Sequence, residues 1–480
     1  MVETQHSVEK MYIDGEWEAS LSGEFLEVVN PANNETIGSV AYGGRKEASR
    51  AIQAAENSFM NWKNLTAKER GSILEEIYNL MIQERKELAY TLTLEQGKPL
   101  KEAEGEINQA ADFVKWYAEE GKRLYGNVIP QSDSDKRILT WYEPVGVTAA
   151  ITPWNFPISM VTRKLAPALS AGCTVVLKPA EATPLSAIKL FELFERAGLP
   201  KGVANLVIGD PIDIGEEFLT NKTVKKISFT GSTEVGKKLY RGSADHVKRV
   251  SLELGGHAPF IVFDDADLEQ AVEGVLQSKF RNAGQTCVSA NRIYVQKNIV
   301  NDFTDLLIQR FQEMKMGNGL NEDTTIGPVI NKSAIEKIQK QVEDAQNKNA
   351  NLMLGGKPVD GEGFFFEPTI LTNVTDDMLM SKEETFGPVL GVWTFDTDEE
   401  VIKRANNTDY GLASYFYTQS LKRTYQISEG LEYGIIGLND PNPAVAQAPF
   451  GGFKESGIGR EGGFYGIQEF VDVKYLSIKL

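Results

Sequence analysis

The chain has 480 residues, of which 41% are hydrophobic and 24% charged, and its formal net charge at pH 7 is −17. This length suffices for two or three domains with substantial cores, and the composition is ordinary for a soluble globular protein. The negative charge argues against nucleic acid or an anionic membrane surface as the main partner. We expect no membrane segment and no signal peptide, because no stretch reaches the roughly 20 apolar residues of a bilayer span and the N-terminus lacks an apolar core.

Cysteines and histidines are few in this sequence. The two thiols, Cys173 and Cys287, do not make a disulfide scaffold and suit a reducing compartment, so we expect a cytoplasmic protein. The histidines are His6, His246 and His257. They form no cluster with the cysteines, and we therefore expect no metal site.

The first half of the chain predicts helices and then a parallel sheet. Residues 45–125 place apolar residues at helical spacing among charges, as in the segment 69–92. Beyond residue 145, short apolar runs rich in β-forming residues alternate with helical stretches, which indicates a parallel sheet covered on both faces. The expected strands lie within residues 146–154, 173–180, 204–209 and 224–232.

A second alternating region begins near residue 249 and predicts a second α/β unit. Two segments fit neither unit: residues 129–144 alternate like an antiparallel hairpin, and residues 470–480 alternate at the C-terminus. Exposed strands of this kind need covering, commonly by another subunit, so we expect a homodimer or homotetramer. The expected boundaries are 1–125 with 145–252 for the first unit, 253–440 for the second, and 126–144 with 458–480 for an oligomerisation element.

Cys287 is the first candidate for chemistry. It lies between a helix and a strand, in FRNAGQTCVSANR. A free cysteine is most often a small buried hydrophobe. Polar neighbours such as Gln285 and Ser289, and a loop placed by rigid elements, instead favour a nucleophile. Cys173 opens an apolar strand, and there we expect a buried structural residue.

Two polar residues end predicted strands. Glu253 closes a β-rich run just before Gly255 and Gly256. It is either an edge ion pair or, since a carboxylate is costly to bury, a general base. Asn155 follows a strand at the edge where open α/β sheets bind ligands. Its amide either caps the next helix, the commoner role for an isolated Asn, or donates to an oxyanion.

Two further turns favour phosphate and sugar binding. In FTGSTEVG, Gly231 allows close backbone approach and Ser232 sits at a helix N-terminus, which favours a phosphate. The segment matches neither the GxGxxG nor the P-loop pattern, so alone it is a weak signal. Lys178 and Glu181 follow another strand in LKPAEATP. They form either a surface ion pair or hydrogen bonds to sugar hydroxyls.

Seven motifs, taken together and in order, resemble the aldehyde dehydrogenase superfamily. The resemblance extends from near residue 10 to the C-terminus, and a chance match of seven ordered motifs is implausible. The motifs are WNFP (154–157), KPAEATP (178–184), FTGSTEVG (229–236), ELGG (253–256), GQTC (284–287), EETFGPV (383–389) and PFGGFKESGIGRE (449–461).

The resemblance implies a Rossmann-like cofactor domain, an α/β catalytic domain and a small β oligomerisation element. It implies oxidation of an aldehyde to the carboxylate with NAD(P), through a thiohemiacetal and then a thioester on Cys287. Asn155 and the Cys287 backbone N–H then form the oxyanion hole, and Glu253 activates the water that hydrolyses the thioester. A base for water separates this scheme from phosphorolysis and from transfer to coenzyme A. Weak esterase activity of Cys287 is an expected side reaction.

The resemblance also implies how the cofactor is bound. Lys178 and Glu181 contact the adenosine ribose, Ser232 the pyrophosphate and Glu384 the nicotinamide ribose, with Phe386 beside the ring. A carboxylate that accepts from the 2′-hydroxyl repels a 2′-phosphate, so we expect NAD to be preferred over NADP, with Lys178 softening the preference. The expected cofactor-binding set is Trp154, Lys178, Glu181, Thr230, Gly231, Ser232, Glu384 and Phe386.

Two arginines narrow the choice of substrate. Arg163 lies eight residues after Asn155, and Arg281 lies six before Cys287. Both resemble the arginines that bind the substrate carboxylate in succinate-semialdehyde dehydrogenases, a role that suits the bidentate guanidinium. Their alternative role is in surface ion pairs. The expected substrate-binding set is Arg163, Arg281, Phe156 and Phe450.

The sequence departs from the succinate-semialdehyde pattern in two places. Ala444 stands where those enzymes usually carry a serine that contacts the same carboxylate, and Asn442 or a backbone N–H is the expected substitute. Ser289 stands where some members carry a second cysteine, so a disulfide switch with Cys287 is impossible. The alternatives left open are glutarate or 2-oxoglutarate semialdehyde, a hydroxyaldehyde such as lactaldehyde, and a non-catalytic NAD-binding protein of the same fold.

Overall fold

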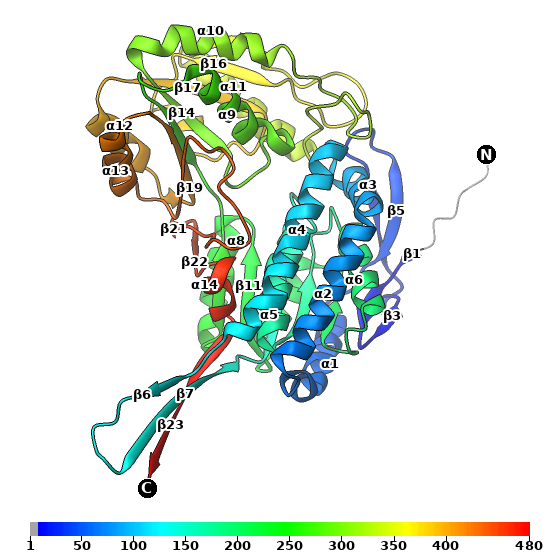
Figure 1. Cartoon of the computed structure of the whole chain (residues 1–480). Helices are drawn as coiled ribbons and strands as arrows, with labels where there is room; N and C mark the ends of the chain where they lie inside the picture. The colour runs from blue at the N-terminus through cyan, green and yellow to red at the C-terminus, as the bar shows by residue number, and fades with distance from the viewer. Residues whose placement is uncertain (1–7) are drawn as a thin grey trace, which may run out of the picture.

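The computed structural model describes residues 8–480 and consists of two α/β units with a narrow arm that projects from one of them (Figure 1). In that view the N-terminal half of the chain forms the lower unit, and most of the chain after residue 258 forms the upper one. His6 lies outside the described residues. Within residues 8–480, no helix has both the length and the apolar character that crossing a membrane requires.

The first unit is built on an eight-stranded sheet. Its strands are β2 (Met11–Ile13), β3 (Glu16–Glu18), β8 (Val147–Ile151), β9 (Thr174–Lys178), β10 (Ala204–Leu206), β11 (Val224–Thr230), β12 (Arg249–Glu253) and β22 (Gly457–Ile458). They are ordered β22-β12-β11-β8-β9-β10-β2-β3, and the five from β12 to β10 are parallel. The apolar runs of the sequence form these central strands, because a parallel sheet is buried on both faces.

Helices pack against this sheet, with α2, α4 and α5 in front of it in Figure 1. The helices of this unit are α1 (Arg45–Lys63), α2 (Ala67–Gln83), α3 (Arg85–Gln96), α4 (Leu100–Glu120), α5 (Ser159–Ala171), α6 (Leu185–Arg196), α7 (Pro211–Thr220), α8 (Thr233–Ser243) and α14 (Gly463–Gln468). The helical segment 69–92 of the sequence is two helices, because the chain breaks at Glu84. A capping box starts α2, in which the Thr66 hydroxyl accepts from the Glu69 N–H.

The second unit is built on a seven-stranded sheet. Its strands are β13 (Ala258–Val262), β14 (Ala290–Gln296), β15 (Asn351–Leu354), β16 (Thr369–Thr372), β17 (Val389–Phe395), β19 (Ala413–Tyr417) and β20 (Ile435–Leu438). Their order is β15-β16-β17-β14-β13-β19-β20, and only the β15–β16 pair is antiparallel within it. Its helices are α9 (Leu268–Phe280), α10 (Val300–Phe311), α11 (Lys332–Asn347), α12 (Asp398–Asn406) and α13 (Leu421–Gly430).

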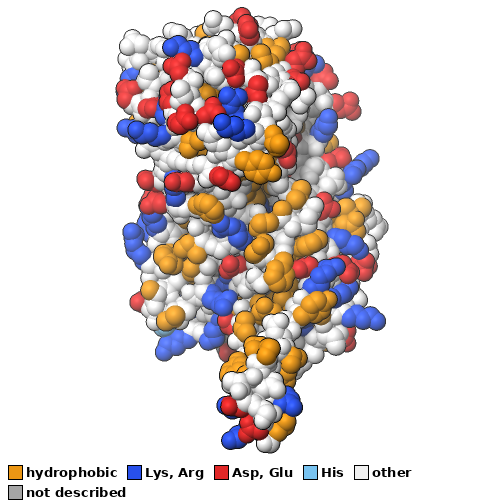
Figure 2. Space-filling model, turned by 60° about the vertical axis from the view of Figure 1, so that its left-hand side comes forward, with side chains coloured by type: hydrophobic (Ala, Val, Ile, Leu, Met, Phe, Trp, Pro, Cys, Tyr) orange, Lys and Arg blue, Asp and Glu red, His pale blue; other side chains and the backbone are white. Residues whose placement is uncertain are grey.

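The arm is a three-stranded antiparallel sheet of β6 (Asn127–Ile129), β7 (Lys136–Pro144) and β23 (Val471–Lys479). Figure 2 shows hydrophobic side chains gathered on the arm and near its base. The remaining short elements are β1 (Val8–Glu9), β4 (Phe25–Val29), β5 (Thr36–Ala41), β18 (Tyr410–Gly411), β21 (Phe453–Lys454), and the 3-10 turns η1 (Gly121–Arg123), η2 (Ala244–His246), η3 (Arg281–Gly284), η4 (Lys297–Ile299) and η5 (Leu379–Ser381).

The two orphan segments of the sequence pair with each other in the arm, but one expected boundary differs. Strand β12 runs parallel to β11 in the first sheet, and all but its last residue, Glu253, lies within the expected range 145–252 of the first unit. Residues 458–468 lie against the first unit and not in the arm. There β22 extends the sheet edge and α14 packs on α4 and α5, burying Ile467 completely.

Candidate active site

A cavity of about 360 Å³ lies where the carboxyl ends of β8, β11 and β12 face loops of the second unit. This is the edge at which parallel sheets bind ligands. Eight residues singled out from the sequence line it. They are Trp154, Asn155, Thr230, Gly231, Ser232, Cys287, Glu384 and Phe386.

Cys287 follows an unusual turn at the end of α9. Three consecutive residues, Asn282, Ala283 and Gly284, have left-handed backbone conformations with φ of 53°, 53° and 76°. A side chain on Gly284 would lie 2.2 Å from the main-chain oxygen of Gly387, so glycine is required there. The turn brings the nucleophile candidate from the second unit to the cofactor edge of the first sheet.

Burial and four nearby charged side chains affect the Cys287 thiol. Burial raises its pKa to about 12, and the carboxylates of Glu384 and Glu253 add to the rise. The positive charges of Arg163 and Arg281 act in the opposite direction. Both arginines singled out from the sequence are thus near enough to the thiol to influence it.

Glu253 occupies the last position of β12, paired in register with Thr230 of β11. It is buried, and its Oε2 has no hydrogen-bond partner among the described residues. Burial raises its pKa well above the usual value, and the neighbouring Glu461 adds to the rise. It forms no ion pair within the described part of the chain, so the edge ion-pair interpretation is not supported. A buried carboxyl with a raised pKa beside a thiol has the properties of a general base.

Asn155 does not cap a helix. Helix α5 begins four residues later, at Ser159, with Ile158 in the cap position. The Asn155 Nδ2 donates to the main-chain oxygen of Gln285 at 3.0 Å, while its own main-chain oxygen accepts from Lys98 Nζ at 2.8 Å. One hydrogen of the buried amide is therefore used to hold the turn before Cys287. The second remains for a ligand oxygen.

Arg163 is buried and not part of a surface ion pair. Its Nε lies 2.9 Å from Oε2 of Glu461, and Lys164 Nζ donates to Oε1 of the same carboxylate at 2.6 Å. Attraction to Lys164 and Arg163 outweighs burial and lowers the pKa of Glu461. The guanidinium also lies 3.8 Å over the ring of Phe450, and its Nη2 has no hydrogen-bond partner. Two cations thus share one carboxylate.

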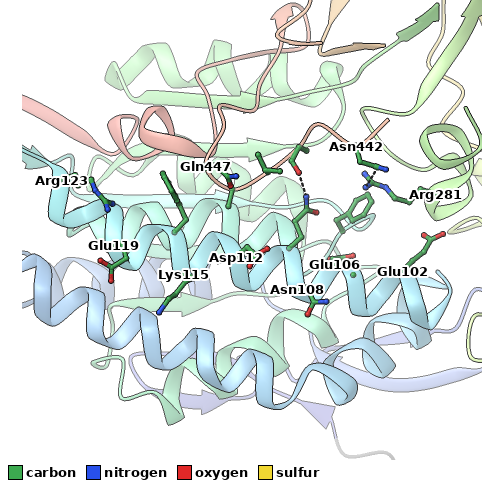
Figure 3. Close-up of a pocket in the computed structure, with 17 residues that line it drawn as sticks. Glu102, Glu106, Asn108, Asp112, Lys115, Glu119, Arg123, Arg281, Asn442 and Gln447 are labelled. Atoms are coloured by element: carbon green, nitrogen blue, oxygen red, sulfur yellow. Dashed lines mark hydrogen bonds between the residues drawn. The ribbon is translucent and has the colours of Figure 1, made fainter. Parts of the chain in front are cut away.

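A larger cavity of about 930 Å³ opens beside α4 (Figure 3). Arg281, Asn442 and Glu102 lie at one end of it, and Arg123 lies at the other. The Arg281 Nη1 donates to Oδ1 of Asn442 at 3.4 Å, and its guanidinium lies 5.3 Å over the ring of Phe156. Phe156 and Ala444 also line this cavity. Because Phe156 follows Asn155 in the chain, the two cavities lie on either side of this dipeptide.

The smaller cavity fits the phosphate and ribose of a dinucleotide. Ser232 is the N-cap of α8 and accepts from the Val235 N–H at 3.3 Å, so the helix N-terminus faces the cavity. The hydroxyl of Thr230, which also lines it, is buried without a partner. Glu384 accepts from the Gly256 N–H at 3.0 Å, and burial raises the pKa of its carboxyl to about 7. These polar groups suit a bound nucleotide.

Two aromatic rings close the same cavity. Trp154 and Phe386 meet edge to face, with ring centroids 5.5 Å apart and planes at 88°. Phe386 has a left-handed φ of 53°, an uncommon conformation for an aromatic residue that directs the ring toward the cavity wall. Such strain is typical of a functional site.

Lys178 and Glu181 lie beyond the walls of this cavity. Lys178 ends β9, next to β8 in the sheet, and its buried ammonium pairs with Glu181. Both residues stand at the same carboxyl edge as Ser232, two strands away from β11. Their place along the sheet is the one expected for the adenosine end of a dinucleotide whose pyrophosphate lies at Ser232.

Comparison with known proteins agrees with this geometry. Residues 17–476 match the aldehyde dehydrogenase family. The chain belongs to this family.

The dehydrogenase is 52% identical to a succinate-semialdehyde dehydrogenase (NADP(+)) of Escherichia coli strain K12, over 98% of its own length and 97% of the relative's. It is 51% identical to a glutarate-semialdehyde dehydrogenase of Pseudomonas putida, over 98% of both chains. Among solved structures, a succinate-semialdehyde dehydrogenase from Burkholderia pseudomallei has a TM-score of 0.97 at 50% identity, with 98% of both chains covered. The protein is therefore an NAD(P)-dependent oxidoreductase that oxidises an aldehyde.

Several residues around the site were not predicted from the sequence. Lys98 and Glu106 form a fully buried ion pair at 2.6 Å, and Glu106 also accepts from the first N–H groups of α5. Glu461 stands in the last motif, but its charge partners are nearly 300 residues away. Glu106 was detectable in principle, because it is a charged residue on the apolar face of α4 beside Ala103 and Ala110.

Proposed function

We propose that this dehydrogenase oxidises an anionic ω-semialdehyde, with succinic semialdehyde as the first candidate, to the dicarboxylate. The supporting observation is the excess of positive charge near Cys287. Arg163 and Lys164 share the single ionised carboxylate of Glu461, and Arg281 adds a further guanidinium at the wall of the larger cavity. A buried excess of cations is costly unless an anion joins it. The carboxylate end of the substrate is that anion.

In the proposed reaction the Cys287 thiol loses its proton to Glu253, and the thiolate attacks the aldehyde carbon. A C–S bond forms, and the carbonyl oxygen becomes an oxyanion that accepts from the free hydrogen of Asn155 Nδ2 and from the Cys287 backbone N–H. A donor of this kind lowers the activation barrier by about 3–4 kcal/mol. NAD(P), held by the residues around the smaller cavity, would supply the oxidising equivalent for loss of the hydride from the same carbon. The acyl group then remains on Cys287 as a thioester.

Glu253 completes the turnover as the proposed base for water. After the proton taken from Cys287 has passed to solvent, its unpaired Oε2 accepts a proton from a water molecule, whose oxygen attacks the thioester carbon. The C–S bond then breaks, the acid is released, and Glu253 returns the proton to the Cys287 thiolate. The raised pKa of this carboxyl makes it basic enough for the task, because a base works best when its pKa lies near the working pH. Glu384, the other carboxylate that raises the pKa of the thiol, already accepts from the Gly256 N–H.

The proposed cofactor contacts follow the cavity. Ser232 with the N-terminus of α8 binds the pyrophosphate, Glu384 binds the nicotinamide ribose, and Lys178 with Glu181 binds the adenosine ribose. Thr230, Gly231, Trp154 and Phe386 line the pocket around them. NAD is the proposed preference because Glu181 opposes a 2′-phosphate.

The substrate alternatives differ in length and charge of the group beyond the aldehyde. Ala444 removes the serine hydroxyl expected at the carboxylate site, and Asn442 is committed to Arg281 and to Gln277, to which it donates at 3.2 Å. A slightly longer acid such as glutarate semialdehyde therefore remains the main alternative, followed by 2-oxoglutarate semialdehyde and lactaldehyde.

Initial rates test the substrate directly. NADH or NADPH formation is measured with succinic semialdehyde, glutarate semialdehyde and neutral butyraldehyde, each with NAD and with NADP. We expect kcat/KM for the two anionic aldehydes to exceed that for butyraldehyde by at least about 100-fold, the effect of one charged contact at 2–3 kcal/mol. Equal rates for butyraldehyde would reject the anionic substrate and leave the thioester chemistry intact.

We also infer that the protein is a homo-oligomer in which the arm packs against a second copy. The arm exposes large apolar side chains, including Val128 at 79% and Tyr475 at 60% of their full accessible surface. An exposed apolar sheet of this kind is an interface or a site of aggregation. Light scattering of the purified protein gives a dimer or tetramer if the inference holds, and Tyr475→Asp shifts it toward the monomer. The free thiols of Cys173 and Cys287 support a cytoplasmic location.

We also propose that the two units supply different parts of the active site. The first unit, residues 1–125 with 145–252, supplies the cofactor site, and the second, residues 253–440, supplies the nucleophile. The support is that Ser232 and Lys178 end strands of the first sheet, while Cys287 precedes β14 of the second.

A further inference from the structure

Asn282 connects the two units beside the nucleophile. Its main-chain N–H donates to Oε2 of Glu102 at 2.7 Å, and its side-chain Oδ1 accepts from Nε2 of Gln96 at 2.8 Å. Its Nδ2 donates to the main-chain oxygen of Asn155 at 2.9 Å and to that of Gln285 at 3.3 Å. Glu102, Gln96 and Asn155 belong to the first unit, whereas Gln285 belongs to the turn of the second.

Every polar group of Asn282 has a hydrogen-bond partner. Besides the four contacts above, its main-chain oxygen accepts from the N–H and from Nε2 of Gln285, both at 3.0 Å. The residue is buried, so each of these groups would cost free energy if it lost its partner. This saturation fixes the orientation of the side-chain amide, with its Oδ1 toward Gln96 and its Nδ2 toward the two carbonyl oxygens.

The backbone conformation at Asn282 is unfavourable by itself and depends on contacts with other residues. Asn282 and Ala283 are both left-handed, a conformation that costs about 1–2 kcal/mol for a residue with a Cβ and that asparagine tolerates better than most. Strained backbone persists where its surroundings determine it. The surroundings here are Gln96 and Glu102, which reach the turn from α3 and α4.

The oxyanion donor is part of the same network. Nδ2 of Asn155 donates to the main-chain oxygen of Gln285 at 3.0 Å, the oxygen that Asn282 also holds. Asn282 therefore contacts both the backbone of the donor residue and the carbonyl against which the donor amide is set. Two residues further along the chain from Gln285 stands Cys287.

We propose that Asn282, oriented by Gln96, is a positioning residue that sets the Asn155 amide relative to Cys287. The proposal rests on the roles proposed above for those two residues. Without the Asn282 amide, the Asn155 backbone and the Gln285 carbonyl each lose a donor, and the two halves of the oxyanion site are no longer tied together. Displacement of a catalytic group by about 1 Å is enough to lower a rate by about 100-fold.

Three reactions of Cys287 distinguish a role of Asn282 in positioning Asn155 from a role in the folding of the turn. Aldehyde oxidation and hydrolysis of p-nitrophenyl acetate both pass through an oxyanion, and the ester reaction needs neither the natural aldehyde nor a cofactor. Alkylation by iodoacetamide displaces iodide at a saturated carbon and develops no oxyanion, so it reports only on the thiol and its turn. The variants are Asn282→Gly, which keeps access to the left-handed conformation, and Gln96→Met, which keeps the volume.

We expect each variant to lower both oxyanion reactions by about 10- to 100-fold in kcat, with KM and the alkylation rate within about threefold of the parent. The double variant should be no slower than Asn282→Gly alone, because the two residues act through one contact. Asn373→Gly is the matched control, since Asn373 is also left-handed and donates its amide to a main-chain oxygen, that of Asn349, far from the site.

Two results would overturn the proposal. A parallel loss of alkylation would show that Asn282 only maintains the fold of the turn, and unchanged oxyanion reactions would show that it does not position Asn155 at all. Failure of the proposed function has a different signature. In that case Cys287→Ala would retain dehydrogenase turnover, whatever the behaviour of the Asn282 variants.

Discussion

Nε of Arg163 lies 2.9 Å from Oε2 of Glu461, so an arginine assigned to the substrate already faces a carboxylate of the protein. The pair is buried and shared with Lys164. A substrate carboxylate would therefore join a pre-existing cluster of charges and would not neutralise an isolated guanidinium. Arg281 stands at the cavity wall, and within residues 8–480 its guanidinium has a hydrogen bond to Asn442 and no ion pair. We therefore expect it to carry the larger share of discrimination between anionic and neutral aldehydes.

Arg281→Gln should raise KM for succinic semialdehyde by about 10- to 100-fold and change KM for butyraldehyde by less than about threefold, since only the anionic substrate loses a charge-assisted contact worth about 1.5–3 kcal/mol. Steady-state kinetics with both aldehydes measure this. Arg123→Gln is the control, because Arg123 lines the opposite end of the same cavity and pairs with Glu120. A uniform rise for both substrates would remove Arg281 from carboxylate recognition.

Arg163→Gln should destabilise the protein as well as slow it. The change removes one of two cations from Glu461, and a buried carboxylate that loses a partner costs about 3 kcal/mol. Urea unfolding measures the loss, and Arg163→Lys, which keeps the charge, should recover most of it. If Arg163→Gln unfolds at the same urea concentration as the parent, the ion pair contributes nothing to stability.

Glu253→Gln should slow both acylation and hydrolysis of the thioester, because the same carboxylate accepts the proton of the Cys287 thiol and the proton of water. NADH should then appear without a burst, at a rate at least about 100-fold below that of the parent, the size of a lost general base. In the parent enzyme the raised pKa of Glu253 means that its basic form is lost as pH falls through that pKa, so kcat should decline toward acid from well above pH 4.5. A rate independent of pH from 5 to 8 would contradict the assignment.

Cys287 should be a slow nucleophile without its substrate. Burial raises the pKa of the thiol to about 12, so iodoacetamide alkylation of the free enzyme should keep rising with pH up to pH 10 and not level off near neutrality. Cys287→Ala should abolish oxidation and leave NAD binding intact by titration calorimetry. Cys173→Ala serves as control and should retain activity, because Cys173 is fully buried beside Phe470, away from the cavity.

Glu181→Ser should shift the cofactor preference. Removing the carboxylate beside Lys178 leaves a buried ammonium free for a 2′-phosphate, so kcat/KM with NADP should rise by about tenfold relative to NAD. Paired rates with the two cofactors at fixed aldehyde concentration test this. An unchanged ratio would place the adenosine ribose elsewhere.

Local signals raised the candidates for the site, and the resemblance of seven ordered motifs decided between their alternative roles. Ser232 at the start of a helix, Cys287 in a polar loop and Glu253 at the end of a strand each follow from a few neighbours in sequence, and the structure places all three at one edge of a sheet. The continuous apolar runs likewise identified the central parallel strands. Such features depend on segments of fewer than ten residues.

What the sequence did not reveal depends on distant contacts. Gln96 meets Asn282 across 186 residues, and Lys164 meets Glu461 across 297. The sheet to which β12 belongs depends on its pairing with β11, which the apolar pattern of either strand does not specify. The chemical type of a residue does not determine which distant side chain it contacts after folding. These contacts could therefore be identified only from the structure.

The two-residue strand β22 and the carboxylate of Glu461 both come from the last 24 residues of the 480-residue chain. During synthesis, domains fold from the N-terminus onward. The first sheet therefore leaves the ribosome with the edge of β12 unpaired and with Arg163 and Lys164 lacking their shared carboxylate. Only after the final segment has emerged does Leu252 pair with Ile458. A chain that ends before residue 457 therefore lacks both the strand that covers the edge of β12 and the carboxylate that Arg163 and Lys164 share.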